Sequence, residues 1–252
     1  MTTTQPPDGH GLLDGKTVVV TAAAGTGIGF ATAQRCALEG ARVLISDRHE
    51  RRLAEAAEQL GASSVPCDVT SVADVDRLFE TAVAELGHVD VIVNNAGLGG
   101  TAELAEMTDG QWDAVLDVTL NGTFRCTRAA LRHMVPRRFG VIVNNASVLG
   151  WRAQRGQGHY AAAKAGVMAL TRCAALEAAS AGVRVNAVSP SLAMHEHLNK
   201  VMSDEDLEML VGREAFGRAA EPWEVATVIA FLASDYSTYM TGEIVSVSSQ
   251  HP

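Results

Sequence analysis

The sequence has few of the features that mark metal-binding, membrane-spanning or nucleic-acid-binding proteins. Its four cysteines are scattered over 252 residues, with no CxxC pair and no histidine at ligand spacing, so we expect buried thiols in a reducing compartment and no metal. No apolar run reaches the roughly 18 residues that a membrane span requires. A formal net charge of −9 argues against nucleic acid and anionic membranes as partners.

The N-terminal residues 1–13 lack the charged start and the apolar stretch of a signal peptide. They are polar and contain Pro6 and Pro7, so we expect a flexible tail on a cytoplasmic protein. Residues 14–252 show no internal linker or repeat, and an apolar content of 47% can build a sizeable core. We therefore expect one large domain after the tail.

Short runs rich in valine and isoleucine alternate with longer, alanine-rich stretches along the chain. The strand candidates are Thr17–Thr21, Arg42–Ser46, Ser64–Cys67, Val89–Asn94, Gly140–Asn145, Val183–Ala187 and Glu243–Val247. The helix candidates are Ile28–Glu39, Glu50–Leu60, Val72–Leu86, Gln111–His133, Gln157–Ala181 and Pro222–Ala233. This alternation predicts βαβ units, and therefore an α/β fold in which helices cover both faces of a parallel sheet.

Residues 191–217 interrupt this alternation, because they have no strand character. Their apolar side chains are Leu192, Met194, Leu198, Met202, Leu207, Met209, Leu210 and Phe216. An apolar insertion of this length after a strand is more often a lid or a binding loop than a pair of core helices, which is the alternative. We expect a lid over an apolar ligand.

A glycine-rich turn joins the first strand to the first helix. It consists of Thr21, Ala22, Ala23, Ala24, Gly25, Thr26, Gly27, Ile28 and Gly29. Glycines at such a turn let the backbone approach a diphosphate, and the helix N-terminus favours its negative charge. The turn therefore predicts a dinucleotide cofactor.

Asp47 lies 18 residues beyond Gly29, at the end of the second strand. An acid at this place can accept hydrogen bonds from an adenine ribose and would repel a 2′-phosphate, which favours NAD. Arg48 follows directly and could attract that phosphate, so NADP stays open. The alternative role of Asp47, as a helix N-cap, does not account for its spacing from the glycines.

Tyr160 and Lys164 stand four residues apart in an alanine-rich stretch that should be helical, and Ser147 lies thirteen residues before Tyr160. Positions i and i+4 share a helix face, so the ammonium should lie beside the phenol and lower its pKa from about 10. Ser147 could bind the same substrate oxygen, and such a trio can move a proton on or off a carbonyl or alcohol oxygen. A chance pair of surface neighbours is the weaker alternative, because the chain has only three tyrosines and three lysines.

From Leu13 to the C-terminus the chain resembles the short-chain dehydrogenase/reductase family. The family pattern is a glycine-rich turn, Asn-Asn-Ala-Gly after the fourth strand, a serine and Tyr-x-x-x-Lys, and residues 94–97, Ser147, Tyr160 and Lys164 supply it here. The resemblance implies one doubly wound Rossmann-type domain with a seven-stranded parallel sheet in the order 3-2-1-4-5-6-7. It also implies an NAD(P)-dependent oxidoreductase that interconverts a secondary alcohol and a ketone.

The resemblance implies a role for each matching residue. Tyr160 is the acid/base, Ser147 positions the substrate oxygen, and Lys164 binds the nicotinamide ribose and holds down the pKa of Tyr160. Asp68 and Val69 flank the adenine. The other implied cofactor contacts are Asn95, Ala96, Gly97, Pro190, Ser191 and Ala193.

Several positions depart from the family pattern. Ala22 replaces the first glycine of the turn, and Gly25 could take up its strained backbone conformation instead. Thr119 stands where the family has an asparagine whose water links the lysine to solvent, and Asn121 lies about 200° further round the helix, so only a local bulge could bring it in. His195 stands where a threonine is common, either at the cofactor or as a solvated loop histidine.

The chemistry of Tyr160 requires a ketone or a secondary alcohol as substrate. We expect a partly apolar molecule bounded by Leu98, Gly99, Leu149, Trp151, Gln154, Gln157, Met194 and His195. The overall pattern resembles 3-oxoacyl-thioester reductases, and the turn resembles an actinobacterial branch that acts on CoA thioesters of steroid-ring breakdown. The expected substrate is thus a CoA or acyl-carrier thioester, or a polycyclic alcohol or ketone.

The stretch 157–181 is weakly polar on nearly all sides, as expected of a helix that is buried on more than one face. The resemblance implies that this helix pairs across a two-fold axis, so we expect a homotetramer, with a dimer as the alternative. Two other functions remain open: a non-catalytic nucleotide-binding regulator or scaffold, and a lyase or epimerase on the same fold.

Overall fold

The computed structural model describes residues 5–194 and 204–249. Its strands are β1 (Thr17–Thr21), β2 (Arg42–Asp47), β3 (Ser63–Pro66), β4 (Val91–Asn94), β5 (Gly140–Asn145), β6 (Val183–Pro190) and β7 (Ile244–Val247). Its longer helices are α1 (Ile28–Leu38), α2 (Glu50–Leu60), α3 (Val72–Leu86), α4 (Asp109–Leu116), α5 (Gly122–Arg137), α6 (Gly158–Ala178), α8 (Asp204–Val211) and α9 (Pro222–Ala233). Shorter turns are η1 (Asp117–Asn121), η2 (Val148–Gly150), η3 (Ala179–Ala181) and η4 (Asp235–Ser237).

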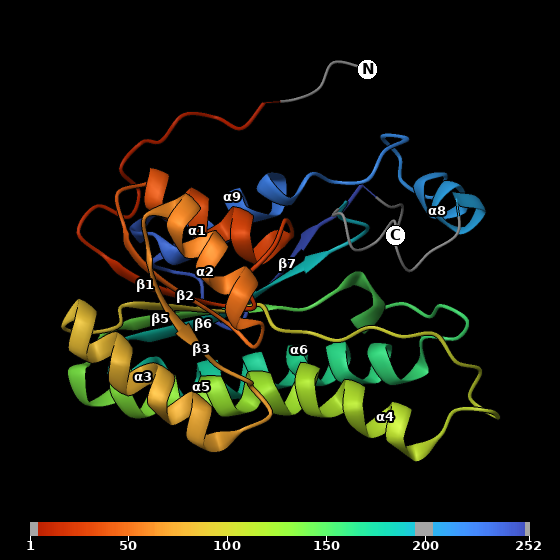
Figure 1. The fold of residues 1–252 in the computed structure, drawn as a ribbon, viewed down its shortest axis with the longest axis horizontal. Coiled ribbons are helices and arrows are strands. Elements are labelled where there is room, and N and C mark those ends of the chain that lie inside the picture. The colour runs from red at the N-terminus through yellow and green to blue at the C-terminus, as the bar shows by residue number, and fades with distance from the viewer. Residues whose placement is uncertain (1–4, 195–203, 250–252) are drawn as a thin grey trace.

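All seven strands run parallel in the order β3-β2-β1-β4-β5-β6-β7, which confirms the expected α/β sheet (Figure 1). Parallel strands need crossover connections, and the chain supplies a helix between every two consecutive strands. The order reverses between β1 and β4. A sheet of this kind binds ligands beyond the carboxyl ends of the strands at such a reversal.

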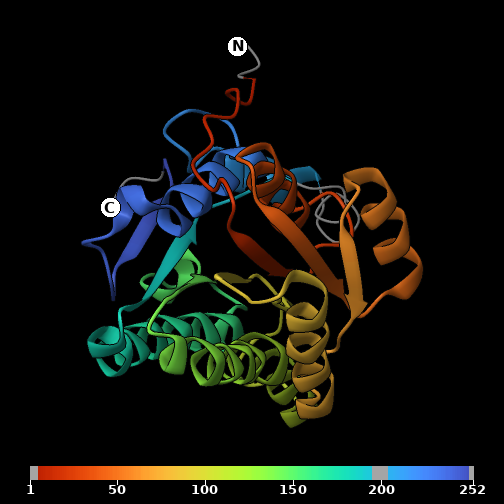
Figure 2. The ribbon, with the colours of Figure 1, turned by 90° about the vertical axis from the view of Figure 1, so that its left-hand side faces the viewer.

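Helices cover both faces of the sheet. Figure 2 shows α1, α2 and α9 on one side and α3, α5 and α6 on the other. Successive strand residues point to opposite faces, so Val18 and Val20 pack in the core under α1 and α9, and Val19 packs in the other core. The apolar cores on the two faces therefore support the strand ends and the loops that follow them.

The helix expected at 111–133 is interrupted. A π-helical turn, η1, joins α4 to α5, so that one extra residue is accommodated where Thr119 lies. Helix α4 begins at a capping box between Thr108 and Gln111. Strand β4 begins at Val91, two residues later than expected, although the backbone of Asp90 already bonds to Thr17 O at 3.1 Å and to Val141 N at 2.8 Å.

The N-terminal segment is bound to α1 rather than loose. A buried ion pair between Arg35 and Glu39 lies beneath it. Arg35 donates to the carbonyl oxygens of Pro7 and Asp8, and Glu39 accepts from backbone N–H groups at 2.8 and 3.0 Å. Leu13 is fully buried. The described part of the tail therefore makes side-chain hydrogen bonds to α1 that its composition did not predict.

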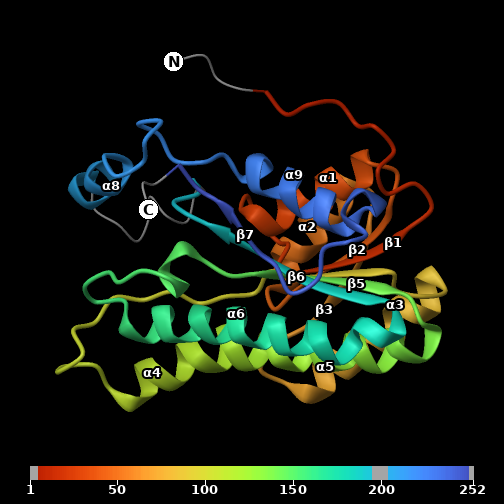
Figure 3. The same ribbon diagram turned by 180° about the vertical axis from the view of Figure 1, so that it is seen from behind.

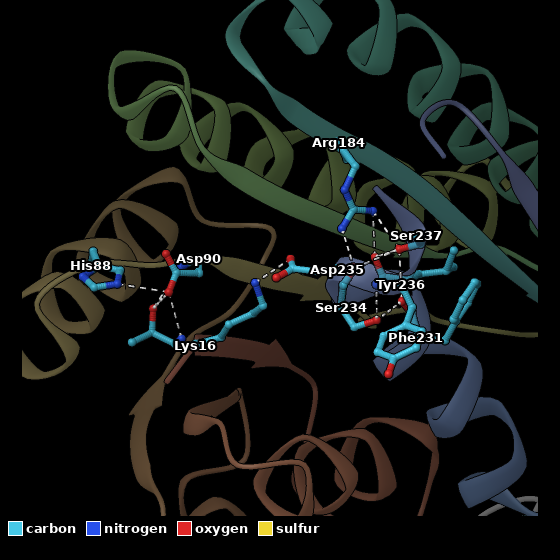
Figure 4. A network of polar contacts seen from close by, with 11 residues as sticks. Lys16, His88, Asp90, Arg184, Phe231, Ser234, Asp235, Tyr236 and Ser237 are labelled. Atoms are coloured by element: carbon cyan, nitrogen blue, oxygen red, sulfur yellow. Dashed lines mark hydrogen bonds and ion pairs between the residues drawn. The ribbon is translucent and has the colours of Figure 1, made fainter. Parts of the chain in front are cut away.

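A second polar network lies at the amino ends of the strands (Figure 4). Lys16 donates to Asp235 at 2.8 Å, and Asp90 accepts from His88 at 3.0 Å. Arg184 donates to the carbonyl oxygens of Leu232 and Ser234. These bonds join β1, β4 and β6 to the end of α9, on the side of the sheet opposite to the carboxyl ends of the strands.

Among the described residues, no helix combines the length and apolarity needed to cross a membrane.

Candidate active site

The structure brings the three residues of the expected acid/base trio together. Tyr160 and Lys164 lie on one face of α6, and Lys164 Nζ is 5.5 Å from the centroid of the Tyr160 ring. Ser147 caps η2 just after β5, accepting from the backbone N–H of Leu149 at 3.2 Å, and its hydroxyl also hydrogen-bonds the phenol of Tyr160. Ser147 and Lys164 are buried, whereas Tyr160 is half-buried.

The electrostatics of the trio differ from the sequence-based expectation. Burial raises the pKa of Tyr160, and the hydrogen bond from Ser147 opposes this only in part. The expected net lowering of the phenol pKa is therefore wrong, since burial outweighs it, and burial also lowers the pKa of the Lys164 ammonium to about 8. That ammonium donates to the carbonyl oxygen of Asn145 at 2.5 Å. The phenol therefore favours its protonated form.

Thr119 does not present a free hydroxyl to the trio. It is fully buried in η1, where its Oγ1 accepts from Leu98 N at 3.0 Å and donates to Leu98 O at 3.3 Å. Asn121 does not replace it, since its amide is exposed and donates to Asp117 at 3.2 Å. The expected bulge is present as the π turn η1, but it keeps Thr119 buried and Asn121 exposed. Through its bonds to Leu98, Thr119 anchors the loop after β4.

The glycine-rich turn keeps its strained conformation at an alanine. Ala22 has φ of 51°, in the left-handed region that favours glycine, so the expectation that Gly25 would take up the strain instead is wrong. Gly25 also has a positive φ, 136°. A Cβ on Gly29 would overlap the carbonyl oxygen of Ala22 and lie 2.5 Å from Asn95 Nδ2, so only glycine fits there.

Helix α1 begins without a side-chain cap. Gly27 is its N-cap and makes no capping hydrogen bond, and the first turn carries no acidic residue, whereas α3 and α4 are capped by Ser71 and Thr108. The backbone N–H groups at this end therefore remain available to an anion. A turn open beside Gly25, where a Cβ would meet nothing within 4 Å, fits a diphosphate.

Asp47 lies at the end of β2 with its carboxylate against the turn. It accepts from Ala24 N at 3.2 Å and from His49 N at 3.0 Å, and is 8% exposed. The N-cap of α2 is His49, so Asp47 is not that cap. An adjacent hollow of about 360 Å³ is lined by eight residues: Arg48, His49, Glu50, Pro66, Cys67, Asp68, Asp74 and Arg77. Its size and place beside Asp47 fit an adenosine.

Val69 lies against the start of α5 and does not line this hollow. It is 6% exposed, and a Cβ on Gly122 would lie 2.6 Å from its side chain. Asp68, in contrast, lines the hollow, where its carboxylate accepts from the backbone N–H of Thr70 at 2.9 Å. Of the two residues expected at the adenine, the structure thus places the side chain of Asp68 at the hollow and that of Val69 in the core.

Asn95 links the loop after β4 to the glycine-rich turn. Its backbone N–H donates to Thr21 Oγ1 at 3.0 Å, and its side chain donates to the carbonyl oxygens of Thr21 and Ala22 at 3.2 and 3.0 Å. Ala96 N also donates to Thr21 Oγ1, at 3.3 Å. A Cβ on Gly97 would lie 3.5 Å from Lys164 Nζ. Residues 95–97 therefore run from the turn to the acid/base trio.

Two loops form one wall next to the trio. Gln157 donates from its side chain to Thr101 Oγ1 at 3.1 Å, and Ala102 N donates to the carbonyl oxygen of Gly156 at 3.0 Å. Trp151 is 50% exposed on this wall. The expected substrate residues here are Leu98, Gly99, Leu149, Trp151, Gln154 and Gln157, and all lie on or beside these two loops.

The remaining expected residues follow β6. Pro190 ends the strand, Ser191 N donates to Val247 O at 3.2 Å, and Ala193 forms a bridge with Ala220. Met194 is half-buried, with its N–H donating to Ala220 O at 2.9 Å. His195, Leu198 and Met202 lie outside the described residues.

Sequence reasoning missed two buried side chains at the site. The Glu214 carboxylate is 4% exposed and accepts from Ser191 Oγ at 3.1 Å and Ser249 Oγ at 2.8 Å, holding the segment after β6 against the end of β7. His159 Nδ1 accepts from Tyr160 N at 2.9 Å inside α6. The position of His159 next to Tyr160 was a usable signal, whereas nothing local distinguishes Glu214 from a surface acid.

Known proteins match this chain over nearly its whole length. The family described as enoyl-(acyl carrier protein) reductase matches residues 22–249. The (5R,7aS)-5-hydroxy-7a-methyl-1-oxo-2,3,5,6,7,7a-hexahydro-1H-indene-carboxyl-CoA reductase of Mycobacterium tuberculosis is 66% identical over 97% of this chain and 96% of its own. The 3-oxoacyl-(acyl-carrier-protein) reductase FabG of Thermotoga maritima is 39% identical over 93% and 97%. A crystal structure of a short chain dehydrogenase from Mycobacterium smegmatis is 59% identical, with a TM-score of 0.89 over 100% and 99% of the two chains.

These relatives agree with the fold. They support oxidoreductase chemistry with a nicotinamide cofactor, and nothing in them supports a non-catalytic regulator. The expected interconversion of an alcohol and a ketone is thereby confirmed. The chain belongs to the short-chain dehydrogenase/reductase family and is an NAD(P)-dependent oxidoreductase.

Proposed function

We propose that this protein reduces the ketone of a partly apolar, ring-bearing CoA thioester, with NADH as the preferred reductant. The observation that carries the proposal is the 66% identity to a reductase whose name specifies a bicyclic indene-carboxyl-CoA. A second relative, which is 39% identical, is named a 3-oxoacyl-(acyl-carrier-protein) reductase. The loops beside Tyr160, with Leu98, Leu149 and Trp151, provide apolar surface for rings.

The chain's own residues would bind, orient and protonate the substrate. The nicotinamide supplies the hydride when bound. Tyr160, whose pKa burial raises, is protonated at neutral pH and gives its proton to the carbonyl oxygen as the alcohol forms. Ser147, already hydrogen-bonded to Tyr160, provides a second contact to that oxygen. Lys164 lies behind the phenol as the next group in the proton path.

The preference for NAD rests on Asp47. Its carboxylate is buried, ends β2 beside the open turn and keeps a fixed negative charge where the adenine ribose would lie. Arg48 lines the hollow but is exposed, so its charge is screened by solvent. Repulsion of a ribose 2′-phosphate by Asp47 would therefore outweigh its attraction to Arg48.

The segment 191–217 would act as a lid. In its described part, Met209 on α8 is 51% exposed and Phe216 is 72% exposed, which is apolar surface that a ring-bearing substrate could cover. Figure 1 shows α8 at the same end of the molecule as η2. We place the protein in the cytoplasm, where a reductase has access to a pool of reduced cofactor and the described cysteines remain free thiols.

We also propose a homotetramer built on α5 and α6. These two helices lie side by side on the outer layer (Figure 3), and each exposes a large apolar side chain: Phe124 is 43% exposed and Leu176 is 84% exposed. Replacing Leu176 with Asp should convert the tetramer to a smaller species, because a charge would be buried at the centre of the interface. Light scattering after size exclusion measures the mass. A wild-type protein that is a monomer at micromolar concentration would refute the assembly.

The substrate assignment is tested by following NADH absorbance with three classes of ketone: bicyclic ketones carried on CoA, straight-chain 3-oxoacyl-CoA and free ketones. We expect kcat/KM to be highest for the bicyclic thioester. Higher kcat/KM for a free ketone would contradict the thioester, and a preference for NADPH of more than about tenfold would contradict the role of Asp47. Tyr160→Phe should remove turnover while leaving NADH binding intact.

A further inference from the structure

The described site contains an amide chain that the acid/base trio does not explain. Lys164 donates to the backbone oxygen of Asn145, the last residue of β5. The side chain of the same Asn145 donates to Asn95 Oδ1 at 2.9 Å, and Asn95 donates to the carbonyl oxygens of Thr21 and Ala22. One continuous set of hydrogen bonds thus joins the buried ammonium to the strained start of the glycine-rich turn.

The orientation of both amides is determined by their partners. The carbonyl oxygens of Thr21 and Ala22 can only accept, so Asn95 must present its NH₂ group to them and its oxygen to Asn145. Asn145 must then present its own NH₂ group to Asn95. Reversing either amide would place oxygen against oxygen. The chain of bonds therefore permits one arrangement only.

Asn145 also carries an unpaired buried acceptor, a cost that it shares with Asn94 on β4. Its side-chain oxygen is buried and has no hydrogen-bond partner among the described residues. Leaving a buried acceptor unpaired costs about 1–3 kcal/mol, and an apolar side chain of similar size would avoid that cost. The cost is retained at the residue whose backbone holds Lys164.

Thr119 Oγ1 is bonded to both backbone groups of Leu98, whereas the hydrogen bond of Lys164 goes to Asn145 O. The groups around Lys164 from the packed elements are Tyr160 on α6, Asn145 on β5 and Gly97 in the loop after β4. Of these only Tyr160 can ionise. The contact with Asn145 is therefore the polar contact that positions the ammonium.

We propose that Asn145 is a positioning residue that couples Lys164 to the cofactor-binding turn, so that the position of the proton-path lysine and the conformation of the turn depend on each other. Occupation of the turn by a dinucleotide would stabilise Ala22 and, through Asn95 and Asn145, hold Lys164 beside Tyr160. The coupling is reciprocal, as any linkage between two sites must be. The inference rests on the proposed reductase activity only for its kinetic readout.

The test is a double-mutant cycle with Asn145→Leu, Asn95→Leu and both together. Each single variant should raise the Kd for NADH about three- to tenfold, and the double variant should be no weaker than the weaker single one, because either change breaks the same chain. Fluorescence titration with NADH measures Kd without turnover. Additive losses in the double variant would overturn the proposal.

The state of Lys164 provides a second readout. The chain has only three lysines, so ¹³C labelling at Cε gives three resonances, and Lys164→Met identifies the one that belongs to Lys164. Asn145→Leu and Asn95→Leu should each lower the pKa of Lys164 by about half a pH unit, a roughly threefold change in its protonation ratio, because a less firmly held ammonium gains less from its carbonyl. The alkaline limb of ketone reduction should move with it.

A matched control lies one residue earlier on the same two strands. Asn94 donates to Asn144 Oδ1 at 2.9 Å, and Asn144 donates to Thr171, so this pair touches neither the turn nor Lys164. Asn144→Leu and Asn94→Leu should lower Tm but leave the Lys164 titration in place. If they move it as far as Asn145→Leu does, the effect is general destabilisation and the inference is wrong. A wild-type protein that binds NADH but reduces no ketone would refute the proposed function alone.

Discussion

At the scale of single residues, Lys164 and Ala22 both hold unfavourable states. Lys164 is 3% exposed, and burial alone lowers its pKa from 10.5 to about 8. Ala22 holds a left-handed backbone conformation that costs an alanine roughly 1 kcal/mol. Unfavourable states of this kind persist where the surrounding structure over-determines them, and they cluster at functional sites. Both residues lie at the site described above.

Replacing Lys164 with Met should stabilise the protein and remove its activity. At pH 7 the charged lysine costs the folded state about 3 kcal/mol, from its fall in pKa, and the lost bond to Asn145 offsets about 1 kcal/mol, so we expect a net gain of about 2 kcal/mol. The cost is fully present below pH 8 and is relieved as pH rises towards 10.5. Urea unfolding should therefore show the gain at pH 7 and little of it at pH 10. A variant less stable than wild type at pH 7 would contradict this account.

Ala22→Gly should stabilise the protein by about 0.5 kcal/mol, because glycine adopts a φ of 51° without steric cost but loses more backbone entropy on folding. Ala23→Gly is the matched control. Ala23 is fully buried and has no positive φ, so the same change there should destabilise by about 1 kcal/mol. Chemical denaturation compares the two. Equal effects at both positions would show that Ala22 is not strained.

At the scale of elements, the π turn η1 determines what the loop after β4 can do. The extra residue of this turn keeps Thr119 inside and Asn121 outside, and the buried hydroxyl of Thr119 pairs with both backbone groups of Leu98. The side chain of Thr119 thus anchors this loop at Leu98, in addition to the bonds made by Asn95, Thr101 and Ala102. The position of this loop therefore depends on the π turn η1, which lies beyond α4 and is not adjacent to the loop in sequence.

Thr119→Val keeps the shape of the side chain and removes both bonds to Leu98. We expect a loss of stability of about 1–3 kcal/mol and a higher KM for the ketone, because the loop that bounds the substrate is released. Binding of NADH at the turn should change little. Thr119→Ser, which keeps the hydroxyl, serves as the control for kinetics, and a ketone KM that rises equally in both variants would show that the hydroxyl is not the anchor.

At the scale of the molecule, the two ends of the sheet serve different purposes. The carboxyl ends carry the turn, the trio and Asn145, with strained and unpaired groups, whereas the amino ends carry the satisfied network of Asp90, Lys16 and Arg184 (Figure 4). Rigid anchoring at one end supports adjustable loops at the other. Stability and activity should therefore be separable by position.

Asp90→Asn should reduce stability without reducing kcat. Burial raises the pKa of Asp90, but bonds from Thr17, Arg137 and His88 outweigh it, so the pKa lies below its usual value. Stability from a lowered carboxyl pKa is present above the unfolded value near 3.9 and is lost as pH falls through the folded value. Unfolding at pH 7 should show a loss of about 2 kcal/mol, and this loss should shrink as the pH falls through the lowered pKa of Asp90. A parallel loss of kcat would show that the two ends are coupled.

Periodicity and motif spacing are local properties of the chain, so they were enough to predict the α/β fold class and to single out Ser147, Tyr160 and Lys164, whereas the strand order came from the resemblance to the family. Only the tertiary structure showed that Ala22 keeps the left-handed conformation and that the hydroxyl of Thr119 is hydrogen-bonded to the backbone of Leu98. It also showed that Lys164 donates to the carbonyl oxygen of Asn145. It also reversed the expected shift of the Tyr160 pKa. The groups that bury a residue and form its hydrogen bonds come from segments distant in sequence. These groups, and not the neighbours along the chain, determine the pKa and the backbone strain of that residue.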